Sequence, residues 1–98
     1  MNIRTHQEND ALHLALNGRL DTTTSPQLDE AIRALAASSN LILDFAQLSY
    51  LSSAGLRVLL SAQKRAMSSG GSLRIRNANE SILEVFELTG FSDFLTLE

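Results

Sequence analysis

The feature that most constrains this chain is a repeated switch between strand-like and helix-like spacing of its apolar residues. In the stretch ALHLALNG, Leu12, Leu14 and Leu16 recur at every second position, as in a β-strand with one buried face. After Pro26, apolar residues recur three and four positions apart, as in an amphipathic helix. A chain that alternates in this way can bury both kinds of apolar face by packing helices against a sheet.

The alternation continues to the end of the chain. The expected strands are residues 3–7, 11–18, 41–45, 72–76 and 94–97. The first expected helix starts at Ser25-Pro26 and ends at 38–40, and the second starts at about Ser53 and ends at 68–71. The third starts at Ala78 or Asn79 and ends at Gly90. The Ser25 hydroxyl is expected to accept a hydrogen bond from a free helix N–H, and a short turn is expected between Phe45 and Tyr50.

The order is therefore strand, strand, helix, strand, helix, strand, helix, strand. Helices inserted between strands require crossover connections, so the later strands should be parallel, and the opening hairpin should add an antiparallel edge. A length of 98 residues suits a single domain. We therefore expect an α/β fold in one domain, residues 1–98, with a mixed, mostly parallel β-sheet and packed helices.

Composition excludes several classes of function. The chain has 8 Lys and Arg residues against 11 Asp and Glu residues and no basic stripe, so no nucleic-acid partner is expected. It has no Cys, which excludes disulfides, a thiol nucleophile and thiolate metal ligands. The first ten residues, MNIRTHQEND, lack the apolar stretch that is typical of a signal peptide, and no stretch reaches the roughly 18 apolar residues of a membrane span. We expect a soluble, cytoplasmic protein with no direct membrane insertion.

The sequence offers little for catalysis or metal binding. The only histidines, His6 and His13, both precede the first helix, and the stretch SSAG at residues 52–55 is not a G-x-S-x-G nucleophile elbow. Two histidines seven residues apart with scattered carboxylates give no metal-ligand spacing. We expect no catalytic residue, no metal and no cofactor; a small hydrolase that uses Ser53 is the least favoured hypothesis.

Two adjacent serines stand where a strand pattern gives way to a helix pattern, in SYLSSAGLRVLL. Ser52 or Ser53 can cap the helix by accepting a hydrogen bond from a free backbone N–H. One helix needs one cap, so a second hydroxyl is left over. A helix N-terminus also favours negative charge, which makes the leftover hydroxyl physically suited to carry a phosphate.

Two carboxylates follow apolar runs: Asp21 ends GRLD, and Asp44 ends the run LILD. If their strands are parallel, both residues should lie at strand ends, on the edge from which Ser52 and Ser53 emerge. Ligands of such sheets gather at that edge. The alternative is that Asp21 caps a turn and that Asp44 is a solvated strand end.

These patterns resemble the STAS domain of bacterial anti-sigma-factor antagonists, over essentially the whole chain. The resemblance lies in ALHLALNGRLD, LILDFAQLSYLSSAGLRVLL and ILEVFELTGFSDFLTL. The family carries Asp-Ser-Ser/Thr-Gly-Leu/Ile at the helix start, and its first serine is phosphorylated. Aligned on Gly55, that phosphoacceptor falls on Ser53, with Ser52 as the reserve. Two departures are Ser52 in place of the family's Asp and Ala54 in place of its second Ser/Thr.

The resemblance implies a phosphorylation-controlled switch in partner binding, with no catalysis of its own. The implied partners are an anti-sigma factor that is also a serine kinase of the histidine-kinase-like ATPase type, and a PP2C-type phosphatase. ATP and metal would belong to those partners. The implied partner-binding residues are Asp21, Asp44, Ser52, Ser53, Ala54, Gly55 and Arg57. The alternative is a non-phosphorylated STAS interaction subunit of a transporter or lipid-transport complex.

Overall fold

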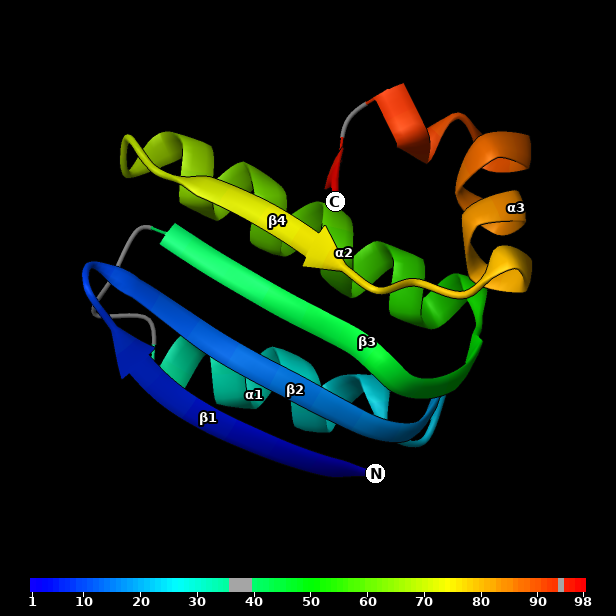
Figure 1. Cartoon of the computed structure of the whole chain (residues 1–98), viewed down its shortest axis with the longest axis horizontal. Coiled ribbons are helices and arrows are strands. Elements are labelled where there is room, and N and C mark those ends of the chain that lie inside the picture. The colour runs from blue at the N-terminus through cyan, green and yellow to red at the C-terminus, as the bar shows by residue number, and fades with distance from the viewer. Residues whose placement is uncertain (36–39, 94) are drawn as a thin grey trace.

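A mixed five-stranded sheet organises the chain, and its strands lie in sequence order (Figure 1). The computed structural model describes residues 1–35, 40–93 and 95–98. Its elements are β1 (Asn2–Glu8), β2 (Ala11–Leu20), α1 (Ser25–Leu35), β3 (Asn40–Leu51), α2 (Ser53–Ser68), β4 (Ser72–Arg76), α3 (Glu80–Thr89), the short 3-10 helix η1 (Phe91–Asp93) and β5 (Thr96–Leu97). The predicted order of strands and helices is confirmed.

The directions of the strands follow from the connections between them. β1 and β2 form an antiparallel hairpin, whereas β2, β3, β4 and β5 pair in parallel. A helix connects each parallel pair: α1 before β3, α2 before β4, and α3 with η1 before β5. The predicted α/β class, with a mostly parallel sheet and an antiparallel edge, is confirmed.

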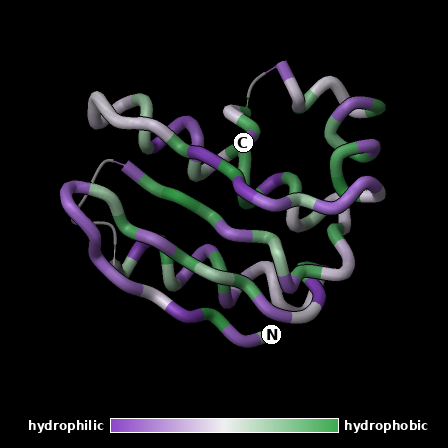
Figure 2. Tube along the Cα trace, viewed as in Figure 1, coloured by the Kyte–Doolittle hydropathy of each residue, from purple (hydrophilic) through white to green (hydrophobic). Residues whose placement is uncertain are grey.

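The core lies between the sheet and the helices α1 and α2, which lie on the same side of it (Figure 1). The predicted inner face of β2 is buried: Leu12, Leu14 and Leu16 are 5%, 0% and 1% exposed. The first half of β3 is a hydrophobic run, whereas the edge strand β1 is mostly hydrophilic (Figure 2). We call the sheet surface that points away from α1 and α2 the open face. Every second residue of each strand has its side chain on the open face. Examples are His6 on β1, His13 on β2 and Arg74 on β4.

The second and third strands are longer than predicted. β2 continues past Gly18 to Leu20, and β3 continues to Leu51 in place of the expected turn after Phe45. The two strands stay paired throughout, with register shifts near residues 15–17 and 18–19. Such irregularities bend a strand and change which residues face inward, so the strict alternation of apolar residues is lost beyond Phe45.

The helix ends agree with the sequence in all but one respect. α1 begins at Ser25, but the Ser25 hydroxyl donates to the Asp21 carbonyl oxygen at 2.5 Å and does not serve as the predicted acceptor. Asn79 caps α3 by accepting from the Ile82 N–H at 2.9 Å, and Gly90 ends it with φ of 79°. The predicted end of the first helix, residues 38–40, falls mostly outside the described residues, as does Phe94. Within the described ranges, no helix is long and apolar enough to cross a membrane.

The core predicts a large contrast between two identical substitutions. Leu43→Ala removes a side chain that is 0% exposed and should lower the free energy of unfolding by about 2–5 kcal/mol. Leu88→Ala removes one that is 79% exposed and should change it by less than about 0.5 kcal/mol. Urea unfolding of the two variants measures the difference, and equal losses would contradict this assignment of the core.

Candidate functional site

The candidate site lies where β2 and β3 end side by side. Leu20 and Leu51 are the last partners of the parallel ladder, and the Ser52 N–H donates to the Leu20 carbonyl oxygen at 2.9 Å. The turn that starts at Asp21 therefore emerges beside the N-terminus of α2. The predicted proximity of Asp21 to the two serines is confirmed.

The two serines have different roles in the local structure. Ser52 is the N-cap of α2: its backbone is extended, and its hydroxyl oxygen accepts from the Gly55 N–H at 3.3 Å. Ser53 is the first residue of the helix and is exposed. Within the described part of the chain, its hydroxyl has no hydrogen-bond partner. The hydroxyl left over after capping thus belongs to Ser53.

The start of α2 sits directly on the ends of the two strands because residue 55 is glycine. Gly55 is buried, and a Cβ built on it would lie 2.7 Å from Leu51 Cδ1 and 2.9 Å from Leu20 Cγ. Any larger residue would force these leucine side chains or the helix to move. Gly55 was expected among the partner-binding residues; in the structure it is buried, and its role there is to let the start of α2 pack closely on the two strands.

The carboxylate of Asp21 organises the turn before α1. Its Oδ1 accepts from the backbone N–H groups of Thr23 and Thr24, at 3.0 Å and 3.1 Å, and from both threonine hydroxyls. The hydrogen bond from the Thr23 hydroxyl, followed by that from the Thr24 N–H, lowers the pKa of Asp21 below its ordinary value. Asp21 is therefore a charged turn cap at the site, which is the alternative considered from the sequence.

A cation and an aromatic ring lie beside this turn, and sequence reasoning missed both. The Arg19 guanidinium lies 4.2 Å from the centroid of the Tyr50 ring, and its Nε lies 3.7 Å from Asp21 Oδ2. Arg19 and Tyr50 are partners across β2 and β3, within the extensions that the sequence did not reveal. Tyr50 is 42% exposed, so this pair adds an accessible aromatic surface to the site.

Arg57 and Ala54 lie on the first turns of α2. Arg57 is exposed and stands four residues after Ser53, so both lie on one side of the helix. Ala54 is half-buried. We call Arg19, Asp21, Tyr50, Ser53 and Arg57 the α2-end surface.

Asp44 does not lie at this end of the sheet, contrary to the prediction. It pairs with Ala15 and Arg76 within β3, which continues seven residues further to Leu51. Its Oδ1 accepts from the Asn77 side-chain amide at 3.1 Å. At about 3.3 Å per strand residue, the distance along β3 from Asp44 to Leu51 is on the order of 20 Å. Asp44 therefore belongs to the open face.

The two histidines lie far from Ser53. His13 is the third residue of β2, near the start of that strand. Ser53 lies near its other end, because it comes two residues after Leu51, the partner of Leu20. A serine nucleophile needs a base within hydrogen-bond reach, so this arrangement argues against the hydrolase hypothesis. The spacing of the histidines in the sequence indicated no metal-ligand set, but the fold brings a ligand atom from each of His6, Glu8 and His13 within 4.8 Å of the others.

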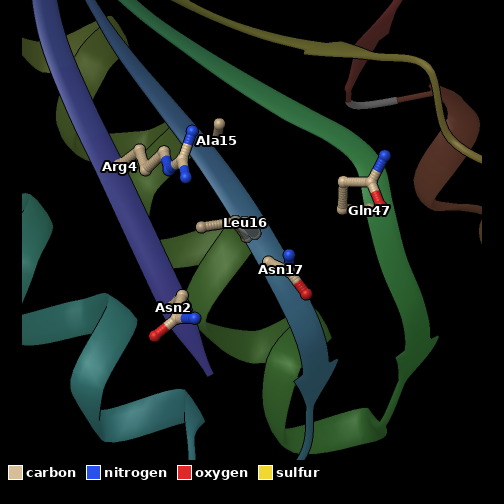
Figure 3. Close-up of a pocket in the computed structure, with 6 residues that line it drawn as sticks. All are labelled: Asn2, Arg4, Ala15, Leu16, Asn17 and Gln47. Carbon is tan, nitrogen blue, oxygen red and sulfur yellow. The ribbon is translucent and has the colours of Figure 1, made fainter.

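A shallow hollow also opens on the open face, where β1, β2 and β3 run side by side (Figure 3). Its lining residues are Asn2, Arg4, Ala15, Leu16, Asn17 and Gln47. The small side chain of Ala15 between longer neighbours leaves this space. The lining contains no carboxylate, histidine or hydroxyl group, so the hollow supplies no acid, base or nucleophile.

The fold is a small α/β domain with an exposed serine, Ser53, at the N-terminus of α2. Comparison with known proteins identifies the family of domains to which it belongs. A family model described as "Mlab, STAS domain" matches residues 3–97, so the chain belongs to the STAS domain family. It is 28% identical over 98 residues to the anti-sigma-B factor antagonist of Bacillus subtilis (strain 168), covering 99% of this chain and 90% of that protein. The resemblance seen in the sequence is confirmed.

Solved structures share the fold. A crystal structure from Thermotoga maritima superposes with a TM-score of 0.91 at 18% identity, covering 97% of this chain and 84% of that one. The structure of the Bacillus cell fate determinant SpoIIAA in its phosphorylated form superposes with a TM-score of 0.77 at 19% identity, covering 99% and 91%. At these identities the likeness establishes the architecture.

The two serines give a matched pair of stability predictions. Ser52→Ala removes the acceptor for the Gly55 N–H and should lower the free energy of unfolding by about 1 kcal/mol. Ser53→Ala removes a hydroxyl without a described partner and should change it by less than about 0.5 kcal/mol. Thermal and urea unfolding measure both. A larger loss for Ser53→Ala would reverse the assignment of the cap.

Asp21 predicts a pH dependence. Because the folded state holds the Asp21 pKa below its ordinary value of 3.8, the charged carboxylate stabilises the fold at neutral pH. Asp21→Asn keeps an acceptor oxygen but loses this contribution. The stability advantage of the original protein over the variant should be full above about pH 5 and shrink as the pH falls through and below the ordinary pKa of 3.8. Urea unfolding over this range measures it, and an advantage independent of pH would contradict the role of the charge.

Proposed function

We propose that this protein is an anti-sigma-factor antagonist whose binding is switched by phosphorylation of Ser53. In the unphosphorylated state it binds an anti-sigma factor through the α2-end surface, and phosphorylation releases it. The observation that carries the proposal is the division of roles at α2, where Ser52 fills the cap and Ser53 remains exposed. The relationship to the Bacillus subtilis anti-sigma-B factor antagonist supports the same function.

The location of Ser53 suits a switch that leaves the fold intact. A phosphate adds about −1.5 to −2 charges at pH 7, and the N-terminus of a helix favours negative charge. Ser53 takes no part in the described hydrogen bonds of the cap, so its modification disturbs none of them. Arg57 stands one turn along the helix, where its guanidinium can reach a phosphate on residue 53.

The effect of the phosphate is exerted on the partner. A docking surface that accommodates a neutral hydroxyl would have to desolvate a dianion and meet any acidic group of its own at short range. Each 1.4 kcal/mol of such cost weakens binding about tenfold. One change of charge on a rigid domain is therefore sufficient to end the interaction.

The proposed partners follow from the family resemblance. The anti-sigma factor would also be the serine kinase, of the histidine-kinase-like ATPase type, and a PP2C-type phosphatase would reverse the modification. Nucleotide and metal would be held by these partners, and this chain would bind without catalysing a reaction. We place the protein in the cytoplasm, where sigma factors act.

A second candidate is a STAS interaction subunit of a transporter or lipid-transport complex. The observation that favours it is the residue before the acceptor, which is Ser52 in place of the family's Asp. In this case the α2-end surface would bind its partner permanently, and Ser53 would remain unmodified. Genes for a permease and an ATPase beside this gene would support the second candidate, and genes for a kinase and a phosphatase would support the first.

Three variants test the switch against the cognate anti-sigma kinase. Ser53→Ala should bind it like the original protein but accept no phosphate from ATP. Ser53→Asp should bind at least about tenfold more weakly, a loss of about 1.4 kcal/mol. Ser52→Ala, the matched control, should still be phosphorylated. Calorimetry and mass spectrometry give the two readouts.

Each contrary outcome has its own meaning. If Ser53→Ala is fully phosphorylated and Ser52→Ala is not, the acceptor is Ser52. If native protein carries no phosphate and Ser53→Asp binds its partner unchanged, the proposal fails and the permanent interaction subunit replaces it.

A further inference from the structure

The hairpin of β1 and β2 brings the two histidines of the chain directly opposite one another on the open face. Residues 9 and 10 form a two-residue turn, with Asn9 at φ of 56°, and the register pairs His6 with His13. A separation of seven residues is what this register requires of a cross-strand pair. The imidazole rings stack with their centroids 4.5 Å apart and their planes 17° apart.

Glu8 adds a carboxylate to this pair. It lies two residues after His6, on the same face of β1, and its Oε2 is 3.3 Å from His6 Nε2 and 3.7 Å from His13 Nε2. Two imidazole nitrogens and one carboxylate oxygen thus converge on a common point from two adjacent strands.

The spacing of these three atoms fits a tetrahedral metal ion. Zn²⁺ takes His nitrogen at about 2.0–2.1 Å and carboxylate oxygen at about 2.0–2.2 Å, which places neighbouring ligand atoms about 3.3–3.5 Å apart. The distance of 3.3 Å from Glu8 to His6 already matches that edge, and the distance of 3.7 Å from Glu8 to His13 is slightly longer. All three atoms lie within 4.8 Å of one another, so small rotations of side chains complete the set.

The burial of the side chains allows these rotations. His6 and Glu8 are 62% and 61% exposed and can turn freely, whereas His13 is 18% exposed and is held by its neighbours. One anchored ligand and two adjustable ligands can close on an ion without movement of the backbone. The fourth position of the tetrahedron remains for water.

We propose that His6, Glu8 and His13 form a binding site for one divalent transition-metal ion, with Zn²⁺ as the ligand. Two imidazoles and one carboxylate select an ion of this class over Mg²⁺ and Ca²⁺, which prefer sets of oxygen ligands. The bound ion would tie the edge strand β1 to β2 and so stabilise the hairpin. This site is independent of the α2-end surface.

The charges around the site are balanced. Glu8 and His13 share a hollow with Asp10 and, from β4, with Arg74 and Arg76. Both arginines pair with Glu98, Arg76 at 2.9 Å and Arg74 at 3.9 Å, which offsets their repulsion of a cation.

The test is a Zn²⁺ titration of the protein without any affinity tag, followed by calorimetry and by the melting temperature. One equivalent should bind and raise the melting temperature, since a ligand of the folded state stabilises it. His13→Gln, His6→Gln and Glu8→Gln should each weaken binding at least tenfold, and excess Mg²⁺ should not compete.

A double variant provides the control for composition. His6→Gln combined with Gln7→His keeps both histidines but moves one imidazole to the opposite face of β1, and it should lose binding like His6→Gln. Circular dichroism without metal shows whether each variant is folded. Zn²⁺ binding that is equally tight in the double variant, or no binding by the original protein, would overturn the proposal.

Discussion

The parallel pairing of β2 and β3 up to their last residues is the constraint on which the rest of the structure depends. Leu20 and Leu51 end the ladder together, and the Ser52 N–H is bonded to the Leu20 carbonyl oxygen. Gly55 then allows the first turn of α2 to rest on both leucines, which leaves no space for a side chain at that position. The start of α2 is therefore held by buried apolar contacts, and its polar surface is not needed to keep it in place.

The buried residues that hold the start of α2 differ from the exposed residues at its surface, which is what the proposed switch requires. Ser52 and Asp21 are used within the fold, as a helix cap and as the cap of a turn. Ser53 and Arg57 are exposed, so a phosphate on Ser53 would not disturb the core. The histidine hairpin lies near the opposite end of β2, and sites so far apart contribute to stability almost independently.

The candidate site was predictable where it depends on neighbours in the chain. Two serines before a helix imply one cap and one free hydroxyl, and the structure gives these roles to Ser52 and Ser53. The contact of Arg19 with Tyr50 was not predictable, because it joins residues 31 positions apart whose pairing depends on the register of β2 and β3. A strand register is set by the packing of whole faces, which no local pattern reports.

By itself, the sequence determined the order of the elements, the inward face of β2 and the ends of α3, because period and caps act within a few residues. Only the tertiary structure decided which residues meet across strands. β3 continues for seven residues beyond Asp44, which separates Asp44 from the serines, and a two-residue turn sets His6 against His13. The physical reason is that cross-strand contacts arise when chain segments pair, and one residue of shift turns every side chain to the other face.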